Sequence, residues 1–508
     1  MRAVRPYQSD IASLLIRLDP RSDAPLYAQI FDGVRARILA GELARGARLP
    51  SSRQLAADLR VSRATVLQAF DALAAEGYIT ALAQSSTRVA LDIPDDLVVK
   101  GGGQRDARAS NRTLRLSRIA RSLRALPTGA PRLAAAPRAF RPGIPALDMF
   151  PIGTWSRVVA RCHARASVAA LDGGDPAGDA LLRESIAAHV TAARGVRCEG
   201  AQVFVTGGTQ LAIDEILRLV IDPGDAVWVE NPGYLGTRRA VITAGGRLAP
   251  IPVDADGLDV DAGIARAPRA RAVILSPSHH YPLGVTLSLP RRMALLRWAR
   301  RARAIVFEDD YDSEFRHRGR PLMALQGLDD TGHTVYVGTF SKTLFPGLRI
   351  GFAVVPPGLV DVVAAARASA AAPASALDQA AVATFIADGH FARHVRRMRR
   401  VYEERSQALV DAVASECGGM LEPRPSDSGM QLWAALRVAC SDVAVRDAAA
   451  QRGIEVAALS SYFVGRARMR GLVFGFGALR PTALRAGVQR LARAIEDADR
   501  TRAKPRRG

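Results

Sequence analysis

Lys342 is the residue of this chain whose chemistry is hardest to replace. Of the 70 lysines and arginines, only Lys100, Lys342 and Lys504 are lysines. Arginine stays protonated, whereas a lysine can lose its proton and form a Schiff base with an aldehyde. Lys100 lies in an Arg- and Gly-rich stretch and Lys504 lies near the C-terminus, so Lys342 is the one lysine in a predicted folded domain. Taken alone, the presence of this lysine would be explained by its chance survival in an arginine-biased chain. The residues around Lys342 decide between chance and a chemical role.

Polar and aromatic groups follow the ends of several predicted strands. One strand runs into Thr206-Gly-Gly-Thr-Gln210 and then a helix, where backbone N–H groups and the helix dipole could hold a phosphate. Tyr234 follows a second strand and could stack on a planar ring, although simple packing is the commoner role. The predicted strands span residues 201–205, 226–229, 304–307 and 334–337.

The third predicted strand ends in the acidic run Glu308–Phe315, and the fourth leads directly to Lys342. Buried acids at a strand end are costly unless they pair or take part in chemistry. A carboxylate, an aromatic ring, a phosphate cradle and one lysine fit a pyridoxal phosphate site. There the carboxylate keeps the pyridine nitrogen protonated and the lysine holds the aldehyde.

The stretch from Pro25 to Ala90 predicts a winged helix. Residues 27–40 carry apolar side chains at helical spacing, and short helices begin after Ser51 or Ser52 and at Ser62. Two short helices joined by a tight turn form a helix-turn-helix, which presents the start of its second helix to the major groove of DNA. The alternative is a small structural helical domain with ordinary surface arginines.

Composition sets broader limits. A chain of 508 residues predicts two to four domains, and its formal net charge of +21 favours polyanions as partners, though an arginine-rich genome could contribute part of it. No apolar run is long enough for a transmembrane helix, and no signal peptide is evident. The four cysteines are scattered without metal-like spacing, so we expect no metal site, reduced thiols and a cytoplasmic protein.

The charge is concentrated between the two predicted modules. Residues 100–138 hold ten basic side chains and one acid, with glycines and prolines typical of a linker. This stretch is either a solvated spacer or a source of nonspecific phosphate contacts. We therefore divide the chain into a winged helix-turn-helix (1–92, core 25–90), a basic flexible linker (93–138), an α/β effector domain with a largely parallel sheet (139–493) and a basic tail (494–508).

The N-terminal module resembles the GntR family of bacterial transcription regulators. The matching stretches are Pro25-Leu-Tyr, Gly46-Ala-Arg-Leu-Pro-Ser-Ser-Arg53, Val61-Ser-Arg-Ala-Thr-Val66 and Leu73-Ala-Ala-Glu-Gly77-Tyr. The family's wing usually has a Gly-rich turn, and residues 83–87 depart from it, which leaves wing contacts open. The resemblance implies double-stranded DNA as partner, bound through Arg48, Ser51, Ser52, Arg53, Ser62, Arg63 and Thr65.

Residues from about Phe140 to Arg493 resemble a fold type I aminotransferase, as in the effector domain of MocR-type regulators within the GntR family. The matching stretches are Phe140-Arg-Pro-Gly-Ile-Pro, Gly174-Asp-Pro-Ala-Gly178, Pro277-Ser-His-His-Tyr-Pro-Leu-Gly284, Glu308-Asp-Asp-Tyr-Asp-Ser-Glu-Phe-Arg316 and Gly338-Thr-Phe-Ser-Lys-Thr-Leu-Phe-Pro-Gly-Leu-Arg349. This implies a large domain with a mostly parallel sheet and a small C-terminal α/β subdomain.

The resemblance also implies roles for individual residues toward pyridoxal 5′-phosphate. Lys342 would form the Schiff base, Asp309 would pair with the pyridine nitrogen, Tyr311 would bond the ring hydroxyl and Tyr234 would stack on the ring. The choice of Asp309 over Asp310 rests on family register, since either could point at the ring from a strand end. The phosphate would be held by Gly208, Thr209, Gln210, Thr339, Ser341 and Arg349.

Some positions depart from the family pattern. Tyr281 replaces the asparagine of true aminotransferases, as an aromatic residue usually does in the regulators, while Gly173 and Asp179 replace tyrosines. If the partner subunit normally supplies one of these tyrosines to the phosphate, cofactor affinity would be lower. Arg470 is our candidate for an effector carboxylate, with a solvent-facing arginine as the alternative.

These observations favour a pyridoxal-phosphate-dependent transcription regulator. It would sense an amine or amino-acid effector, or the cofactor itself, and the resemblance implies a head-to-tail homodimer without membrane attachment. One alternative is an active aminotransferase with an accessory DNA-binding domain. Another is a regulator whose site no longer binds the cofactor.

Overall fold

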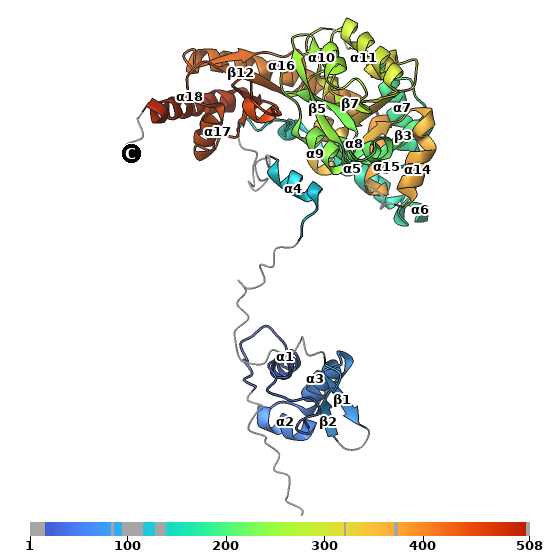
Figure 1. The fold of residues 1–508 in the computed structure, drawn as a ribbon, viewed down its shortest axis with the longest axis vertical. Helices are drawn as coiled ribbons and strands as arrows, with labels where there is room; N and C mark the ends of the chain where they lie inside the picture. Colours follow the sequence, from blue (N-terminus) through green and yellow to red (C-terminus); the bar gives the residue numbers. More distant parts are fainter. Residues whose placement is uncertain are drawn as a thin grey trace, which may run out of the picture. The chain divides into compact units, whose positions relative to one another are not determined.

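The computed structural model describes residues 16–82, 86–93, 115–126, 139–319, 322–369 and 374–503 (Figure 1). The chain divides into two compact units, Met1–Arg115 and Leu116–Gly508, which we describe separately. In the described ranges, every helix is too short or too polar to cross a lipid bilayer.

The first unit is a winged helix, as predicted. Its helices are α1 (Leu26–Leu39), α2 (Ser52–Leu59) and α3 (Arg63–Ala75), and its wing pairs β1 (Ile79–Leu82) with β2 (Ser86–Val89) in antiparallel register. Ser51 and Ser62 cap α2 and α3 by accepting the backbone N–H groups of Gln54 and Thr65. The apolar residues of the three helices form one buried core. Part of the wing turn, residues 83–85, lies outside the described residues.

The second unit contains an eight-stranded sheet in the order β3-β10-β9-β8-β7-β4-β5-β6. The neighbours from β5 through β4, β7 and β8 to β9 are parallel, whereas β10 runs antiparallel to both β9 and β3. The largely parallel sheet is thus confirmed, with β10 as an exception. The strands are β3 (Val203–Thr206), β4 (Ala226–Asn231), β5 (Arg247–Asp254), β6 (Gly257–Leu258), β7 (Ala272–Leu275), β8 (Ile305–Asp310), β9 (Thr334–Thr339) and β10 (Gly351–Val354).

Helices cover the sheet on both faces, which is why its strands are nearly continuous apolar runs. One buried cluster joins the sheet to α8, α9 and α14, and another joins it to α10 and α11. The helices of this part are α5 (Ile152–Ala164), α6 (Val168–Leu171), α7 (Ala180–Arg194), α8 (Thr209–Val220), α9 (Leu235–Thr243), α10 (Val260–Arg266), α11 (Leu289–Ala302), α12 (Leu325–Leu328), α13 (Phe340–Thr343), α14 (Val360–Ala368), α15 (Ala376–Ala387) and α16 (His390–Glu416).

The predicted small C-terminal subdomain is present. Its antiparallel sheet has the order β11-β12-β14-β13, and α16 packs against α18 beside it. Helix α18 (Pro481–Ala503) continues well past Arg493, so the predicted start of a basic tail at residue 494 is wrong. The remaining elements are β11 (Leu421–Arg424), β12 (Gln431–Leu436), α17 (Asp442–Gln451), β13 (Ala457–Ala458) and β14 (Gly471–Gly475).

Part of the stretch predicted as a flexible linker is helical. Helix α4 (Arg118–Ala125) is capped by Ser117, belongs to the second unit and contacts α9. Ala120 and Leu123, three residues apart, are its half-buried positions. The dense arginines hid this short apolar repeat. The other residues of the predicted linker that follow Ile93, namely 94–114 and 127–138, lie outside the described residues.

A short arm at residues 139–146 ties the start of the effector domain to the C-terminal subdomain. The ring of Phe140 packs edge-on against Phe474 at 5.7 Å, and the Gly475 N–H donates to the Phe140 carbonyl at 2.8 Å. At its other end the Ala146 N–H donates to the buried hydroxyl of Tyr402 on α16 at 3.0 Å. The arm is therefore fixed at both ends.

Removal of the Tyr402 hydroxyl tests this attachment. In Tyr402→Phe the buried Ala146 N–H loses its acceptor, so we expect the free energy of unfolding to fall by about 1–3 kcal/mol. Denaturant unfolding of the second unit measures it. Tyr27→Phe is the control, because the Tyr27 hydroxyl bonds no described residue. An unchanged midpoint for Tyr402→Phe would show that this bond does not hold the arm.

Candidate functional site

The carboxyl ends of neighbouring parallel strands bring the predicted site residues to one edge of the sheet. Asp309 is the penultimate residue of β8, Lys342 lies on α13 directly after β9, and Tyr234 follows β4. In open α/β sheets this edge is where ligands bind. The topology of the sheet therefore brings these three predicted site residues to the same edge.

Lys342 is covered by the arm. Its Nζ donates a hydrogen bond to the Gly143 carbonyl at 2.7 Å. Gly143 has a φ of +74°, and a Cβ at this position would lie 2.6 Å from the lysine nitrogen. Both the backbone conformation and the close approach thus require glycine here. Lys342 is the only lysine among the described residues.

The two adjacent aspartates, which the sequence left undistinguished, have different surroundings. Asp310 accepts hydrogen bonds from Arg194 Nε at 2.8 Å and from the Tyr336 hydroxyl at 2.7 Å, all three being buried. Asp309 Oδ1 is buried and accepts none from the described residues. Burial, followed by the charges of Asp310 and Asp312, raises the pKa of Asp309 to about 7, and the charge of Lys342 opposes this rise. Of the two aspartates, Asp309 is thus the one with a buried oxygen that accepts no hydrogen bond from a described residue.

Tyrosines form an aromatic wall beside these groups. The Tyr281 ring meets Tyr234 edge-on at 5.8 Å, Tyr311 at 6.3 Å and Tyr462 at 5.2 Å. The hydroxyls of Tyr281 and Tyr462 are 2.7 Å apart. Tyr234 is 42% exposed, so its ring is available to a ligand. Burial raises the pKa of Tyr281 and Tyr311 well above the usual value, so both phenols stay protonated.

The predicted phosphate-binding residues lie at or near the ends of three neighbouring strands, β3, β10 and β9. In register, Thr206 of β3 pairs with Gly351 of β10, which pairs with Thr339 of β9. Gly208 follows at a φ of +119°, and a Cβ on Gly351 would come within 2.7 Å of its Cα. This close approach leaves the N-terminus of α8, with Thr209 and Gln210, beside Thr339 and Ser341. Arg349 is exposed, in a left-handed conformation two residues before Gly351.

The structure does not bring Arg470 to this group. Its side chain is exposed and donates to the carbonyls of Ala439 and Cys440 at 3.0 and 3.1 Å. Its neighbour on β14, Val473, instead packs with Tyr462 in a buried cluster. This geometry matches the alternative interpretation, in which Arg470 is a solvent-facing arginine.

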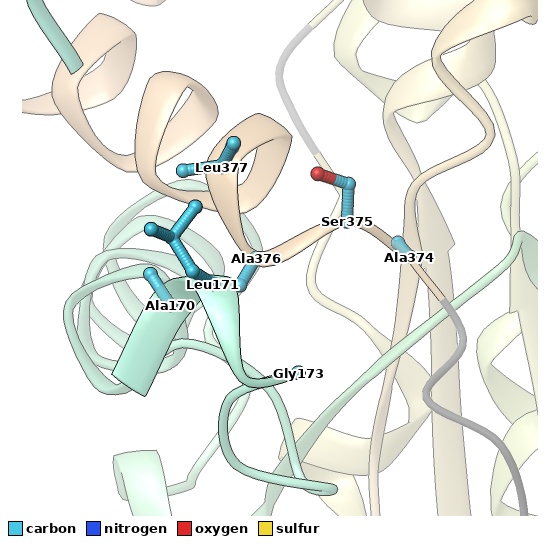
Figure 2. A pocket seen from close by; sticks show the side chains of 7 residues that line it. All are labelled: Ala170, Leu171, Gly173, Ala374, Ser375, Ala376 and Leu377. Carbon is cyan, nitrogen blue, oxygen red and sulfur yellow. The ribbon is translucent and has the colours of Figure 1, made fainter. Parts of the chain in front are cut away.

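The two positions that lack the family tyrosines lie close together in the sequence but differ in role. Asp179 caps α7 by accepting the Leu182 N–H at 2.8 Å. Gly173 borders a hollow of ≈ 330 Å³ whose lining side chains are small or aliphatic and come from α6 and the start of α15 (Figure 2). The lining residues are Ala170, Leu171, Gly173, Ala374, Ser375, Ala376 and Leu377.

The sequence did not reveal the buried residues that form hydrogen bonds around the site. Arg194, at the end of α7, reaches Asp310 and also the Ser278 hydroxyl at 2.6 Å. His279 is buried between Asp312, at 2.8 Å, and Ser426, at 3.0 Å. An arginine among 67 gave no signal of burial, whereas His279 lay inside a motif already quoted.

The seven predicted DNA-binding residues lie on α2, α3 and the segments that precede them. The Arg63 Nε donates to the Ser52 hydroxyl at 3.3 Å, which links the starts of the two helices. Arg53 and Arg63 are exposed, and Arg48 forms a β-bridge with Arg88 of the wing. A helix-turn-helix with one exposed arginine near the start of each helix can contact a phosphate backbone.

Comparisons with known proteins agree with this architecture. The family model "Bacterial regulatory proteins, gntR family" matches residues 26–89, and "Aminotransferase class I and II" matches residues 155–473. The chain is 39% identical, over 95% of its length and 96% of the relative's, to the probable rhizopine catabolism regulatory protein MocR of Rhizobium meliloti. It is 31% identical, over 96% and 99%, to the pyridoxine biosynthesis regulator PdxR of Corynebacterium glutamicum.

Among solved structures, the chain is similar to the α-aminoadipate aminotransferase LysN of Thermus thermophilus. The TM-score is 0.66 at 28% identity, with 71% of this chain and 92% of that chain covered. That structure contains N-(5′-phosphopyridoxyl)-L-leucine. The second unit therefore has the fold type I aminotransferase fold.

The unpaired burial of Asp309 predicts a pH-dependent stability. Its pKa of about 7 lies above the unfolded value, so between about pH 4 and 7 the folded chain binds more protons than the unfolded one. Stability from this group is therefore lost as the pH rises. We expect Asp309→Asn to be more stable than the wild type at pH 8, by at most about 4 kcal/mol, with no gain near pH 4. Chemical unfolding of the cofactor-free protein at both pH values measures this, and equal stability at pH 8 would contradict it.

Proposed function

The chain belongs to the MocR-type subfamily of the GntR family of bacterial transcription regulators, and from this premise we propose that it couples a pyridoxal-phosphate site to DNA binding. The observation that carries the proposal is that Lys342, the only lysine among the described residues, lies at the same edge of the sheet as the buried Asp309, whose Oδ1 accepts no hydrogen bond from a described residue. A surface cation and a structural acid would not require this arrangement. The protein would act on DNA in the cytoplasm.

The residues present fit the cofactor. Pyridoxal 5′-phosphate supplies an aldehyde that condenses with a primary amine and a ring that withdraws electrons when its nitrogen is protonated. Lys342 would provide the amine, and the Asp309 carboxylate would accept a hydrogen bond from the protonated ring nitrogen and so keep it protonated. Tyr311 would bond the ring hydroxyl, and Tyr234 would stack on the ring. The phosphate would be held by Gly208, Thr209, Gln210, Thr339, Ser341 and Arg349.

The effector would be an amine or amino acid, or the cofactor itself. Both possibilities are kept because the relatives differ in what they regulate. One is named as a probable regulatory protein of rhizopine catabolism, and another as a regulator of pyridoxine biosynthesis. A ligand alters DNA binding only if it binds two arrangements of the protein with different affinities. Helix α4 contacts α9, whose first residue follows Tyr234, so the site and the predicted linker share one element.

We also propose that the protein acts as a homodimer with head-to-tail contacts. The support from this chain is a set of apolar side chains left exposed around α6: Val168 at 82%, Leu171 at 69% and Leu181 at 73%. Leu171 also lines the hollow beside Gly173. Exposed apolar clusters of this kind mark surfaces that a partner covers.

The second candidate function is an active aminotransferase, which the similarity to a working enzyme of the same fold supports. A keto-acid assay with a panel of amino donors separates the two. Sustained turnover would favour the enzyme, whereas at most a single half-reaction would favour the regulator. Purified protein in which the absorbance of the added cofactor remains that of free pyridoxal phosphate would overturn both.

Replacement of Lys342 tests the proposed coupling. In Lys342→Ala the amine is absent, so we expect the visible absorbance of added cofactor to remain that of free pyridoxal phosphate. We also expect DNA binding to persist but no longer to respond to the cofactor, measured by fluorescence anisotropy of an operator fragment. A Lys342→Ala variant whose DNA binding still responds like the wild type would contradict the proposal.

Replacement of two arginines tests the DNA interface. Each lost phosphate contact should flatten the dependence of log K on log salt by about one unit, so Arg53→Ala with Arg63→Ala should flatten it by about two. The control removes the same charge from exposed positions of α11, through Arg297→Ala with Arg300→Ala. If the two double variants bind DNA alike, the helix-turn-helix is not the DNA-binding element.

A further inference from the structure

Arg238 is a buried cation with an unusual set of partners. It lies on α9, is 4% exposed, and forms no ion pair with a described residue. Its guanidinium donates to two backbone carbonyls instead, those of Tyr462 and Phe463, the latter at 3.1 Å. Burial lowers its pKa to about 10, so it remains charged at neutral pH. A leucine would fill such a position without the cost of burying a charge. The hydrogen bonds to the two carbonyls are therefore the reason that an arginine occupies it.

The carbonyls belong to a loop of the C-terminal subdomain, residues 462–464. The same loop is held by the segment between β4 and α9. The Gly233 N–H donates to the Tyr462 carbonyl at 3.0 Å. Asn231 Oδ1 accepts the Val464 N–H at 2.8 Å, and its amide donates back to the Val464 carbonyl at 3.4 Å. Segment 231–238 thus grips three consecutive residues of the other subdomain.

Tyr234 lies in the middle of the gripping segment, and Tyr462 lies in the gripped loop. The Tyr462 hydroxyl meets that of Tyr281, whose ring packs edge-on against Tyr234 and Tyr311. A displacement of the loop would therefore move Tyr462 away from Tyr281 and loosen the aromatic wall. The positions of Tyr234 and Tyr462 in the aromatic wall therefore both depend on the contacts between the segment and the loop, which include those of Arg238.

We propose that Arg238 is a positioning residue, which latches the 462–464 loop onto the 231–238 segment and so fixes the tyrosines that face the cofactor ring. This inference rests on the proposed role of Tyr234 at that ring. Among the described residues, Arg238 forms no hydrogen bond with a predicted cofactor residue; it acts through the loop. The latch therefore joins the two subdomains beside the aromatic wall.

The experiment compares Arg238→Gln, Arg238→Lys and the wild type. Arg367→Gln is the matched control, because Arg367 is also 4% exposed and on a helix of the same sheet layer, but it pairs with Glu215 on α8. Hydrogen exchange of the cofactor-free proteins is followed in peptides that cover residues 231–238 and 459–465. Titration with pyridoxal 5′-phosphate is followed by visible absorbance.

We expect faster exchange in both peptides for Arg238→Gln, with partial recovery in Arg238→Lys, which keeps one donor cation, and no change in Arg367→Gln. We expect the dissociation constant of the cofactor to rise about tenfold in Arg238→Gln, or about 1.4 kcal/mol, and less in Arg238→Lys. Unchanged exchange in Arg238→Gln would overturn the latch. Faster exchange with an unchanged dissociation constant would overturn its positioning role. A wild type that binds no cofactor would instead overturn the proposed function, and the exchange data would still decide the latch.

Discussion

The site depends on an electrostatic constraint: the Asp309 carboxylate is buried, its Oδ1 accepts no hydrogen bond from a described residue, and the charge of Lys342 acts on it. Burial of such a carboxylate destabilises the fold, whereas Asp310 beside it accepts two hydrogen bonds at its Oδ2. A protonated ring nitrogen would resolve this cost. The fold therefore carries a local instability that a cationic ring relieves, and ligand binding would stabilise the protein by mass action.

Around Asp309 and Lys342, some side chains are held in fixed positions, whereas the position of the aromatic wall can change. Arg194 and Tyr336 hold Asp310 from inside the sheet, and the arm holds Lys342 through the Gly143 carbonyl. The aromatic wall is instead built across two subdomains, so its geometry depends on how they meet. Because α4 contacts α9, a change in how the two subdomains meet can reach the second half of the predicted linker. These links give the proposed sensor a physical route without a change in the sheet.

Much of this was predictable from the sequence, because motifs at strand ends report topology. The winged helix, the mostly parallel sheet and the C-terminal subdomain are confirmed, and the strands that precede Tyr234, Asp309 and Lys342 were placed within a few residues. Contacts made through side chains of common type were not predictable. Arg194 and Arg238 look like any other arginine until the fold buries them. Helix α4 was hidden by its arginines, and the length of α18 by its basic composition.

The central claim is that Lys342 bears the cofactor. Borohydride reduction of the purified protein after incubation with pyridoxal 5′-phosphate, followed by peptide mass spectrometry, tests it directly. The account predicts one stable pyridoxyl adduct, on the peptide that spans Lys342. An adduct confined to Lys100, Lys504 or the N-terminus, or no adduct at all, would contradict it.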